Sequence, residues 1–140
     1  MLHSRSISHS VRLALAALVV GAPFAAAASE ALKPGDAANG AQIYEECSLC
    51  HSIAENIVGP RHCGIVGRKS ATIADFEYSE AMKKAGLTWD EATLNKYLAN
   101  PAAMVPDTAM GFVGLAEEQA RADVIAYLKK AGDPAVCAKQ

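Results

Sequence analysis

Five consecutive residues, Cys47 to His51, constrain this chain more than any other part of its sequence. They read C-S-L-C-H, which is the C-x-x-C-H pattern of covalent c-type haem attachment. Two thiols three positions apart lie about one helical turn apart, so both can bond the vinyl groups on one porphyrin edge. The next residue places an imidazole beneath the iron. The motif therefore predicts one haem c, bound through Cys47 and Cys50, with His51 as an iron ligand.

Two other interpretations of the motif are weaker. A thioredoxin-like C-x-x-C would need a βαβ setting, and the sequence shows no alternating β-branched runs. A zinc site would need a second ligand pair at matching spacing. Only His62 and Cys63 come close, and their pattern is wrong for zinc.

The first 28 residues are expected to be a secretory signal peptide, and residues 29–140 the functional domain. Arg5 and Arg12 precede an apolar run over residues 13–28, which Pro23 interrupts and an A-x-A pattern closes before Ser29. The run is shorter than the roughly 18 residues expected of a membrane-spanning helix. An uncleaved membrane anchor is the alternative. Export agrees with haem c, because this haem is attached outside the cytoplasm.

Charge and composition exclude some classes of protein. The chain has 13 basic and 15 acidic residues, and residues 1–28 hold two of the arginines and no acid, so residues 29–140 carry a net charge of −4. A nucleic-acid-binding protein normally carries a basic surplus, so this class is not expected. Aromatic residues make up only 6% of the chain, which leaves a small domain short of core-filling side chains. A bound cofactor would fill that space.

The pattern of caps and apolar residues predicts an all-α fold with long loops. Helices are expected from Asp36 to about Leu49, from Ser79 to Gly86, from a Thr88/Glu91 capping box to Pro101, and from about Glu117 to Ala131. The segments 53–75 and 101–114 are expected to be irregular. Gly40 lies inside the first helix, where glycine costs about 1 kcal/mol relative to alanine. A close helix–helix contact would explain it.

The sixth coordination position of the iron has three candidate methionines, Met82, Met104 and Met110. A sulfur ligand suits electron transfer, whereas an open site suits gas binding or peroxidase chemistry. Met110 is the first choice, because it lies in an irregular run that can be shaped around a haem. Met104 is the second choice, and Met82 is expected to have an ordinary packing role.

The sequence resembles class I cytochrome c, of the soluble bacterial and mitochondrial type, from residue 35 to about residue 131. The resemblance rests on stretches spread over that whole range. They are GAQIY at 40–44, CSLCH at 47–51, GP at 59–60, GIVGRK at 64–69, FEYS at 76–79, GLTW at 86–89, YLANP at 97–101, VPDTAMGF at 105–112 and RADVIAYLKKA at 121–131. The implied fold is a small cytochrome c fold, with several helices and long loops around one covalently bound haem.

The resemblance also implies roles for single residues. His51 would be the proximal ligand and Met110 the distal ligand, and the Pro60 carbonyl would accept a hydrogen bond from His51. The remaining implied haem neighbours are Arg68, Tyr78 and Trp89 around the propionates, and Tyr97 and Thr108 near the Met110 sulfur. Gly40 and Tyr44 would pack against Val124 and Tyr127, where the first and last helices cross.

Some residues depart from the family pattern. Asp107 replaces the usual glycine before Thr108, and Ala109 replaces a lysine commonly found before the methionine. The ring of lysines of the mitochondrial protein is missing; basic pairs remain at residues 83–84 and 129–130.

Cys63 and Cys137 are left over after haem attachment; a disulfide between them is expected in an oxidising compartment, with two unrelated thiols as the alternative. His62 is expected to be a surface loop residue.

These expectations combine into a monomeric, periplasmic electron carrier that is not an enzyme, in which one haem c cycles between ferric and ferrous states with His51 and Met110 as axial ligands. Its expected partners are transient redox proteins: a quinol-oxidising complex, a terminal oxidase, a photosynthetic centre or a periplasmic dehydrogenase. No nucleic acid and, once the signal is cleaved, no stable membrane insertion are expected. The alternatives are a small haem peroxidase or gas-binding haem protein, and a membrane-anchored cytochrome module.

Overall fold

A computed structural model describes residues 33–137, so the signal-peptide prediction for residues 1–28 lies outside the described part of the chain. The described part is helical, as predicted, and an isolated bridge between Lys69 and Thr88 is its only β pairing. Its helices are α1 (Ala37–Cys47), α2 (Glu80–Ala85), α3 (Glu91–Ala99), α4 (Pro101–Met104), α5 (Glu118–Ala131) and α6 (Pro134–Cys137).

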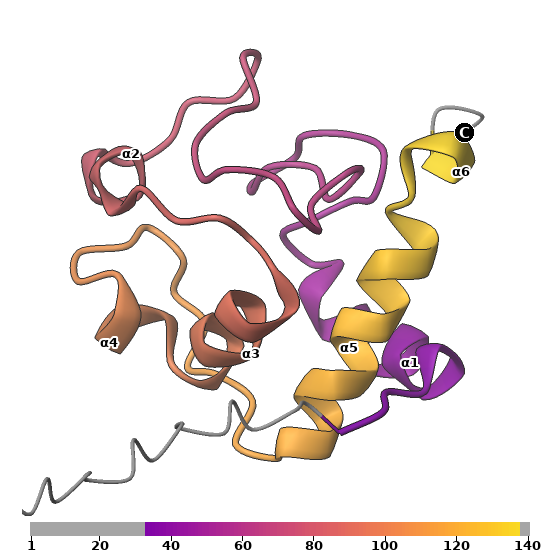
Figure 1. The fold of residues 1–140 in the computed structure, drawn as a ribbon. Helices are drawn as coiled ribbons and strands as arrows, with labels where there is room; N and C mark the ends of the chain where they lie inside the picture. Colours follow the sequence, from indigo (N-terminus) through magenta and orange to yellow (C-terminus); the bar gives the residue numbers. More distant parts are fainter. Residues whose placement is uncertain (1–32, 138–140) are drawn as a thin grey trace, which may run out of the picture.

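Helices α1 and α5 cross each other and form the main helix–helix contact of this part (Figure 1). The crossing is close, because a Cβ atom at Gly40 would overlap the backbone carbonyl of Asp123. Tyr44 and Tyr127 pack beside this point with their ring centroids 4.9 Å apart. The expected reason for a glycine inside the first helix is therefore confirmed.

A buried acid lies at the same crossing. The Asp123 side chain on α5 is buried, and its carboxylate accepts hydrogen bonds from the Asp36 amide (2.7 Å), from Asn39 Nδ2 (2.6 Å) and from Gln119 Nε2 (2.9 Å). These donors favour the ionised carboxylate and hold the pKa of Asp123 below its usual value. The start of α1 is thus bonded to the middle of α5. Sequence reasoning missed this contact.

Local sequence explains where most helices begin. Asp36 accepts hydrogen bonds from the amides of residues 38 and 39, and Ser79 accepts one from Met82, as N-caps do. Gly86 ends α2 with a φ of 61°, which glycine adopts without strain. The predicted Thr88/Glu91 capping box is wrong: Asp90 is the N-cap of α3, because its carboxylate accepts from the amide of residue 93.

Helix boundaries differ from the predictions at three more places. The first helix ends at Cys47 rather than near residue 49, whereas α5 agrees with the helix predicted from about Glu117 to Ala131. The run after Pro101 begins as the four-residue helix α4, because Asn100 caps it and proline suits the first helical position. Helix α6, near the C-terminus, was not predicted.

The hydrophobic core lies where α1, α3 and α5 meet and extends into the loop segments. Its buried members are Tyr44, Ile65, Trp89, Leu94, Tyr97, Leu98, Val105, Val124, Ile125 and Leu128. Apolar side chains from the segments between the helices also pack on this core but remain only partly buried, including Ile53, Val66 and Leu87 on either side of α2 and Met110 after α4. The loops therefore pack on the core together with the helices.

The C-terminal part is joined to the loop that follows α1. Cys63 and Cys137 lie side by side, with their Cα atoms 5.8 Å apart, and the Gly64 amide donates to the Gly132 carbonyl at 2.6 Å. Cys47 and Cys50 are free. The four cysteines thus divide into two pairs, of which the motif pair keeps its thiols.

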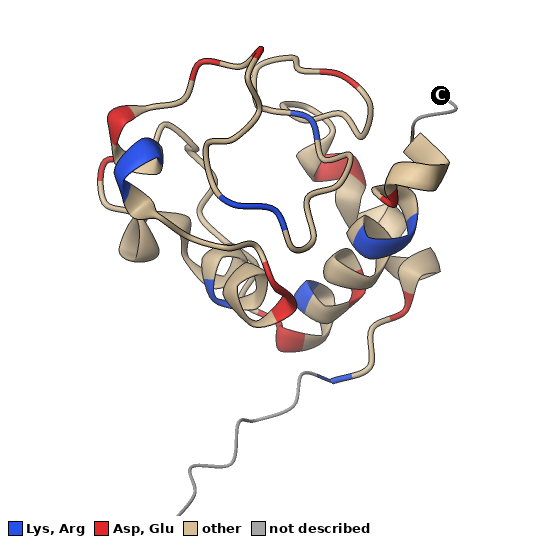
Figure 2. Ribbon diagram, turned by 45° about the horizontal axis from the view of Figure 1, so that its top comes forward, with Lys and Arg blue, Asp and Glu red and all other residues tan. Residues whose placement is uncertain are grey.

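Charged residues of both signs are distributed over the described part. Lys and Arg lie on α2, on the loop between α1 and α2 and on α5, with Asp and Glu between them (Figure 2). Among residues 33–137, no helix has the length and apolar character needed to cross a membrane.

Candidate functional site

The C-x-x-C-H motif lies at the end of α1 and continues its helical turn. Cys47 is the last residue of α1, and its carbonyl accepts hydrogen bonds from the amides of Cys50 (3.1 Å) and His51 (2.8 Å). The turn places both thiols and the imidazole close together at one end of the helix. Cys47 is half-buried, and burial raises the pKa of its thiol; Cys50 is exposed.

His51 is oriented by the loop that follows the motif. Its Nδ1 donates a hydrogen bond to the Pro60 carbonyl at 2.8 Å, as predicted. Burial lowers the pKa of His51, whereas the hydrogen bond to the Pro60 carbonyl raises it; burial has the larger effect. Because Nδ1 carries the proton in the neutral ring, Nε2 keeps its lone pair and is the nitrogen available to a metal.

Gly59 allows this loop to approach the imidazole. A Cβ atom at residue 59 would lie 2.7 Å from Nδ1 of His51 and 2.8 Å from its Nε2, which is too close for any side chain. The Gly59 amide also donates to the Cys50 carbonyl at 2.7 Å, so the loop is bonded to the motif itself. The Gly59-Pro60 pair was identified in the sequence, but the contact with the ring was not.

The expectation that His62 is a surface loop residue is wrong. Its ring stacks on the His51 ring, with centroids 4.2 Å apart and planes 21° apart, and its Nδ1 lies 3.0 Å from the Tyr44 hydroxyl. Burial, together with the nearby His51 and Arg68, lowers the pKa of His62 well below its usual value. The sequence alone gave no signal for this contact, because the pairing depends on how the loop folds back.

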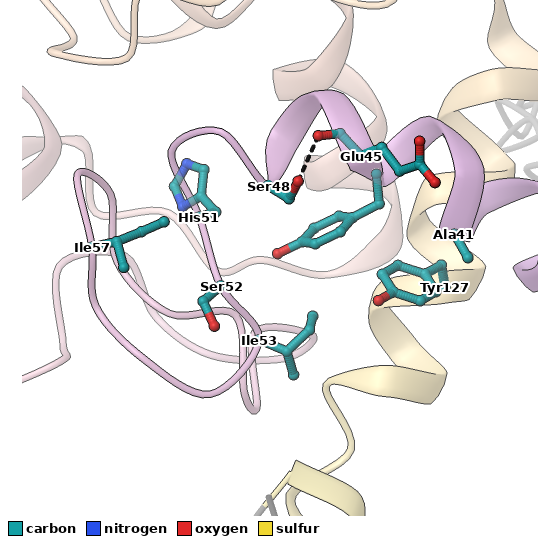
Figure 3. A pocket seen from close by; sticks show the side chains of 9 residues that line it. Ala41, Glu45, Ser48, His51, Ser52, Ile53, Ile57 and Tyr127 are labelled. Carbon is teal, nitrogen blue, oxygen red and sulfur yellow. Dashed lines mark hydrogen bonds between the residues drawn. The ribbon is translucent and has the colours of Figure 1, made fainter.

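A groove runs beside the motif helix and has a volume of about 410 Å³. Figure 3 shows the His51 ring and Ile57 at one end, Ser48 and Glu45 along α1, and Tyr127 of α5 at the other end. One side of the imidazole therefore faces this groove.

The three residues expected around the propionates come from neighbouring segments. The Arg68 guanidinium donates to the carbonyls of Cys63 (2.6 Å) and Arg61 (3.1 Å), and the Trp89 amide donates to the Arg68 carbonyl at 2.8 Å. Burial lowers the pKa of Arg68, while the nearby Tyr78 raises it. Trp89 thus lies beside Arg68 and Tyr78 lies near it, and contacts of these three residues to a haem stay a prediction.

The region of Met110 is also organised around hydrogen bonds. Thr108 Oγ1 accepts from the Met110 amide at 3.3 Å and lies 3.3 Å from the Tyr97 hydroxyl. Burial raises the pKa of Tyr97. Asp107 has a φ of 63°, the left-handed conformation in which glycine is favoured, so the glycine usual at this position has a backbone reason. Met110, like Met104 and Met82, is partly buried against the core.

A family comparison identifies the chain at this point. The family model described as Cytochrome c matches residues 37–132, which include the motif, the loop after it that carries Gly59, Pro60 and His62 (the proximal loop), and the Met110 segment. The chain belongs to the cytochrome c family. Members of this family are electron carriers rather than enzymes, and they bind one covalent haem c through a C-x-x-C-H motif.

Individual relatives agree over most of the chain. Cytochrome c2 of Rhodomicrobium vannielii is 50% identical over 113 residues, which cover 79% of this chain and 90% of the relative. Cytochrome c2 of Blastochloris viridis is 42% identical over 122 residues, covering 85% and 92%. The solved structure of cytochrome cH from Methylobacterium extorquens superposes with a TM-score of 0.67 at 45% identity, covering 69% of this chain and 99% of that one. The predicted cytochrome c fold is therefore confirmed.

The residues present fit a covalently bound haem. Two free thiols lie within one turn, and the adjacent imidazole offers Nε2. These groups match thioether attachment and one histidine ligand, and a sulfur ligand from Met110 stays a prediction. Within residues 33–137, no group of three or more His, Cys, Asp or Glu side chains is arranged to hold a bare metal ion.

Proposed function

We propose that this cytochrome c is a periplasmic electron carrier in which His51 and Met110 are the axial ligands of the haem iron. The observation that carries the proposal is the 2.8 Å hydrogen bond from His51 Nδ1 to the Pro60 carbonyl. It fixes the tautomer in which Nε2 binds the iron and raises the basicity of the ring. Haem, when bound, supplies a one-electron couple between ferric and ferrous iron.

The protein's contribution is to hold both ligands in place in either oxidation state. Cys47 and Cys50 would attach the haem to the end of α1, and the Pro60 carbonyl holds the His51 ring. At the second proposed ligand, Thr108 holds the Met110 backbone through its amide and contacts the Tyr97 hydroxyl. A soft sulfur ligand raises the reduction potential, and a filled sixth position leaves no site for a substrate.

Replacement of Met110 tests the proposal. In Met110→Ala the reduction potential should fall by a sizeable part of the roughly 0.8 V that axial ligands span in haem proteins, and the ferrous protein should bind carbon monoxide rapidly. An optical spectrum in both redox states, with a potentiometric titration, measures both effects. Met104→Ala is the matched control, because Met104 is also partly buried against the core and is the second candidate ligand.

Two results would reject this assignment. The first is an unchanged reduction potential in Met110→Ala, which would discard Met110 as a ligand; if the potential falls in Met104→Ala instead, Met104 is the ligand. Rapid carbon monoxide binding to the unmodified ferrous protein would favour a gas-binding or peroxidase role.

We also propose that residues 1–28 are removed on export and that the mature domain, residues 29–140, acts as a monomer in the periplasm. The support is the basic, apolar and small-residue pattern of the N-terminus together with the haem motif. Its redox partners would be proteins of that compartment or its membrane, including quinol-oxidising complexes, oxidases, photosynthetic centres and dehydrogenases. The mass of the protein isolated from the periplasmic fraction decides between cleavage before Ser29 and a retained anchor.

A covalent bond between Cys63 and Cys137 is part of this proposal. The Cα separation of 5.8 Å is typical of disulfides, and an oxidising compartment favours the bond. Thiol labelling of the denatured, unreduced holoprotein should find no free cysteine, since Cys47 and Cys50 are consumed by the haem. Two labelled thiols would reject the bond.

A further inference from the structure

His62 connects the proposed iron ligand to the crossing of α1 and α5. Its ring stacks on His51 at 4.2 Å, and its Nδ1 lies 3.0 Å from the Tyr44 hydroxyl. Tyr44 is buried in the core and packs on Tyr127 of α5 at 4.9 Å. A continuous series of contacts therefore joins the rigid helix pair to the imidazole of the haem motif.

The hydrogen bond to Pro60 does not by itself set the plane of the His51 ring. One bond through Nδ1 fixes which nitrogen carries the proton, but the ring can still rock about the line that joins Nδ1 to its acceptor. A flat partner nearly parallel to the ring, 21° from it, opposes this rocking because tilting would bring ring atoms into collision. His62 occupies that place.

The loop that carries His62 is itself bonded to the residues directly after His51. The His62 amide donates to the Ser52 carbonyl at 2.9 Å, and the Cys63 amide donates to the Ile53 carbonyl at 2.7 Å. These two bonds hold the segments that carry the imidazoles side by side. The stacked pair is therefore built into the backbone rather than formed by two freely moving side chains.

We propose that His62 is a positioning residue that sets the plane of the His51 imidazole relative to the haem, and that the Tyr44 hydroxyl sets the His62 ring. The inference rests on the proposed role of His51 as an iron ligand. The plane of an axial imidazole decides which iron orbitals it overlaps. His62 therefore controls how unpaired spin is distributed over the haem in the ferric state.

Ferric holoprotein variants test this role. His62→Leu removes the stack, and Tyr44→Phe removes only the hydroxyl that faces His62. Tyr127→Phe is the matched control, because it removes a hydroxyl from the tyrosine that packs on Tyr44. The readouts are the chemical shifts of the four haem methyl groups in the proton NMR spectrum and the g-values in the EPR spectrum, both of which depend on ligand orientation.

The expected result is a changed order or spread of the methyl shifts, with changed g-values, in His62→Leu and to a smaller degree in Tyr44→Phe. Tyr127→Phe should match the unmodified protein, and His62→Phe, which keeps a flat ring, should restore much of the original pattern. The unmodified protein tests His51 separately, because a spectrum without histidine ligation would reject the ligand assignment before any variant is compared.

The proposal is overturned if His62→Leu unfolds at a lower temperature but keeps the methyl shifts and g-values of the unmodified protein, since His62 would then be a packing residue only. Equal shifts in Tyr44→Phe and Tyr127→Phe would also overturn it. If His62→Leu does not accumulate as holoprotein, Tyr44→Phe decides alone. Methyl shifts and g-values identical to those of the unmodified protein would then reject the proposal.

Discussion

At the scale of single residues, Gly59 shows how much of the proximal site depends on a missing side chain. The residue lies against the His51 ring, while the neighbouring Pro60 carbonyl accepts a hydrogen bond from Nδ1 of that ring. The contact and the hydrogen bond involve the consecutive residues 59 and 60, so a shift of either residue would disturb both interactions.

Gly59→Ala should destabilise the holoprotein by about 1–3 kcal/mol, because the added methyl overlaps the imidazole and displaces either the ring or the loop. Denaturant unfolding followed by haem absorbance measures the change. Gly111→Ala is the control, since a Cβ at residue 111 meets nothing within 4 Å; it should stay within about 0.5 kcal/mol of the unmodified protein. Equal effects of the two substitutions would contradict the contact.

At the scale of helices, the crossing of α1 and α5 is the best-specified feature of the fold. A small residue at Gly40 lets the backbones touch, and the Asp123 carboxylate holds the first turn of α1 on the middle of α5. Packing and hydrogen bonding therefore act on the same pair of helices.

Gly40→Ala should destabilise the protein by about 1–3 kcal/mol, although alanine is the better helix former by about 1 kcal/mol. The added methyl would overlap the Asp123 carbonyl and force the helices apart. Unfolding free energies from guanidinium titrations measure this, with Gln42→Ala on the exposed side of α1 as the control. A more stable Gly40→Ala protein would show that propensity outweighs packing here.

The pH dependence of stability in Asp123→Asn tests the role of the buried carboxylate. Its hydrogen bonds lower the pKa in the folded state, so the unfolded state binds the proton more tightly. The stabilisation is complete above the unfolded pKa, about 3.9, and is lost as the pH falls through the lower folded value. The unfolding midpoint of Asp123→Asn in urea should therefore depend less on pH below about 4, and be lower at pH 7. Glu118→Gln, an exposed carboxylate of the same helix, controls for the loss of one charge.

At the scale of the whole molecule, the Cys63–Cys137 pair encloses most of the domain. The two residues are 74 positions apart and join the loop that carries His62 to the end of the chain beyond α5. The neighbouring Gly64–Gly132 hydrogen bond reinforces the same junction. The proximal loop is thus anchored at both the motif and the C-terminal helices.

The double variant Cys63→Ser/Cys137→Ser should lose about 2–4 kcal/mol of unfolding free energy, because the unfolded chain gains the freedom of a long open loop. Its haem spectrum should be retained, since Cys47 and Cys50 are untouched. Guanidinium unfolding of the oxidised protein and of the double variant provides the comparison. Equal stabilities would show that the haem and the core already hold this junction.

The sequence by itself determined the features that depend on a few neighbouring residues. These features are the haem motif, the caps at Asp36 and Ser79, and the end of α2 at Gly86. Their interactions span at most four positions, so the local sequence is sufficient to predict them. The family resemblance added the fold, the His51–Pro60 bond and the place of Gly40.

Only the tertiary structure decided the contacts between distant positions. His62 bonds to Tyr44, 18 positions away, and Asp123 bonds to Asn39, 84 positions away. From residue type and local sequence, a histidine in a turn-rich loop and an aspartate on a helix would both be expected at the surface. They become a half-buried stacked ring and a buried acid because the folded backbone brings a stacking partner to His62 and hydrogen-bond donors to Asp123. No local sequence pattern encodes these long-range contacts.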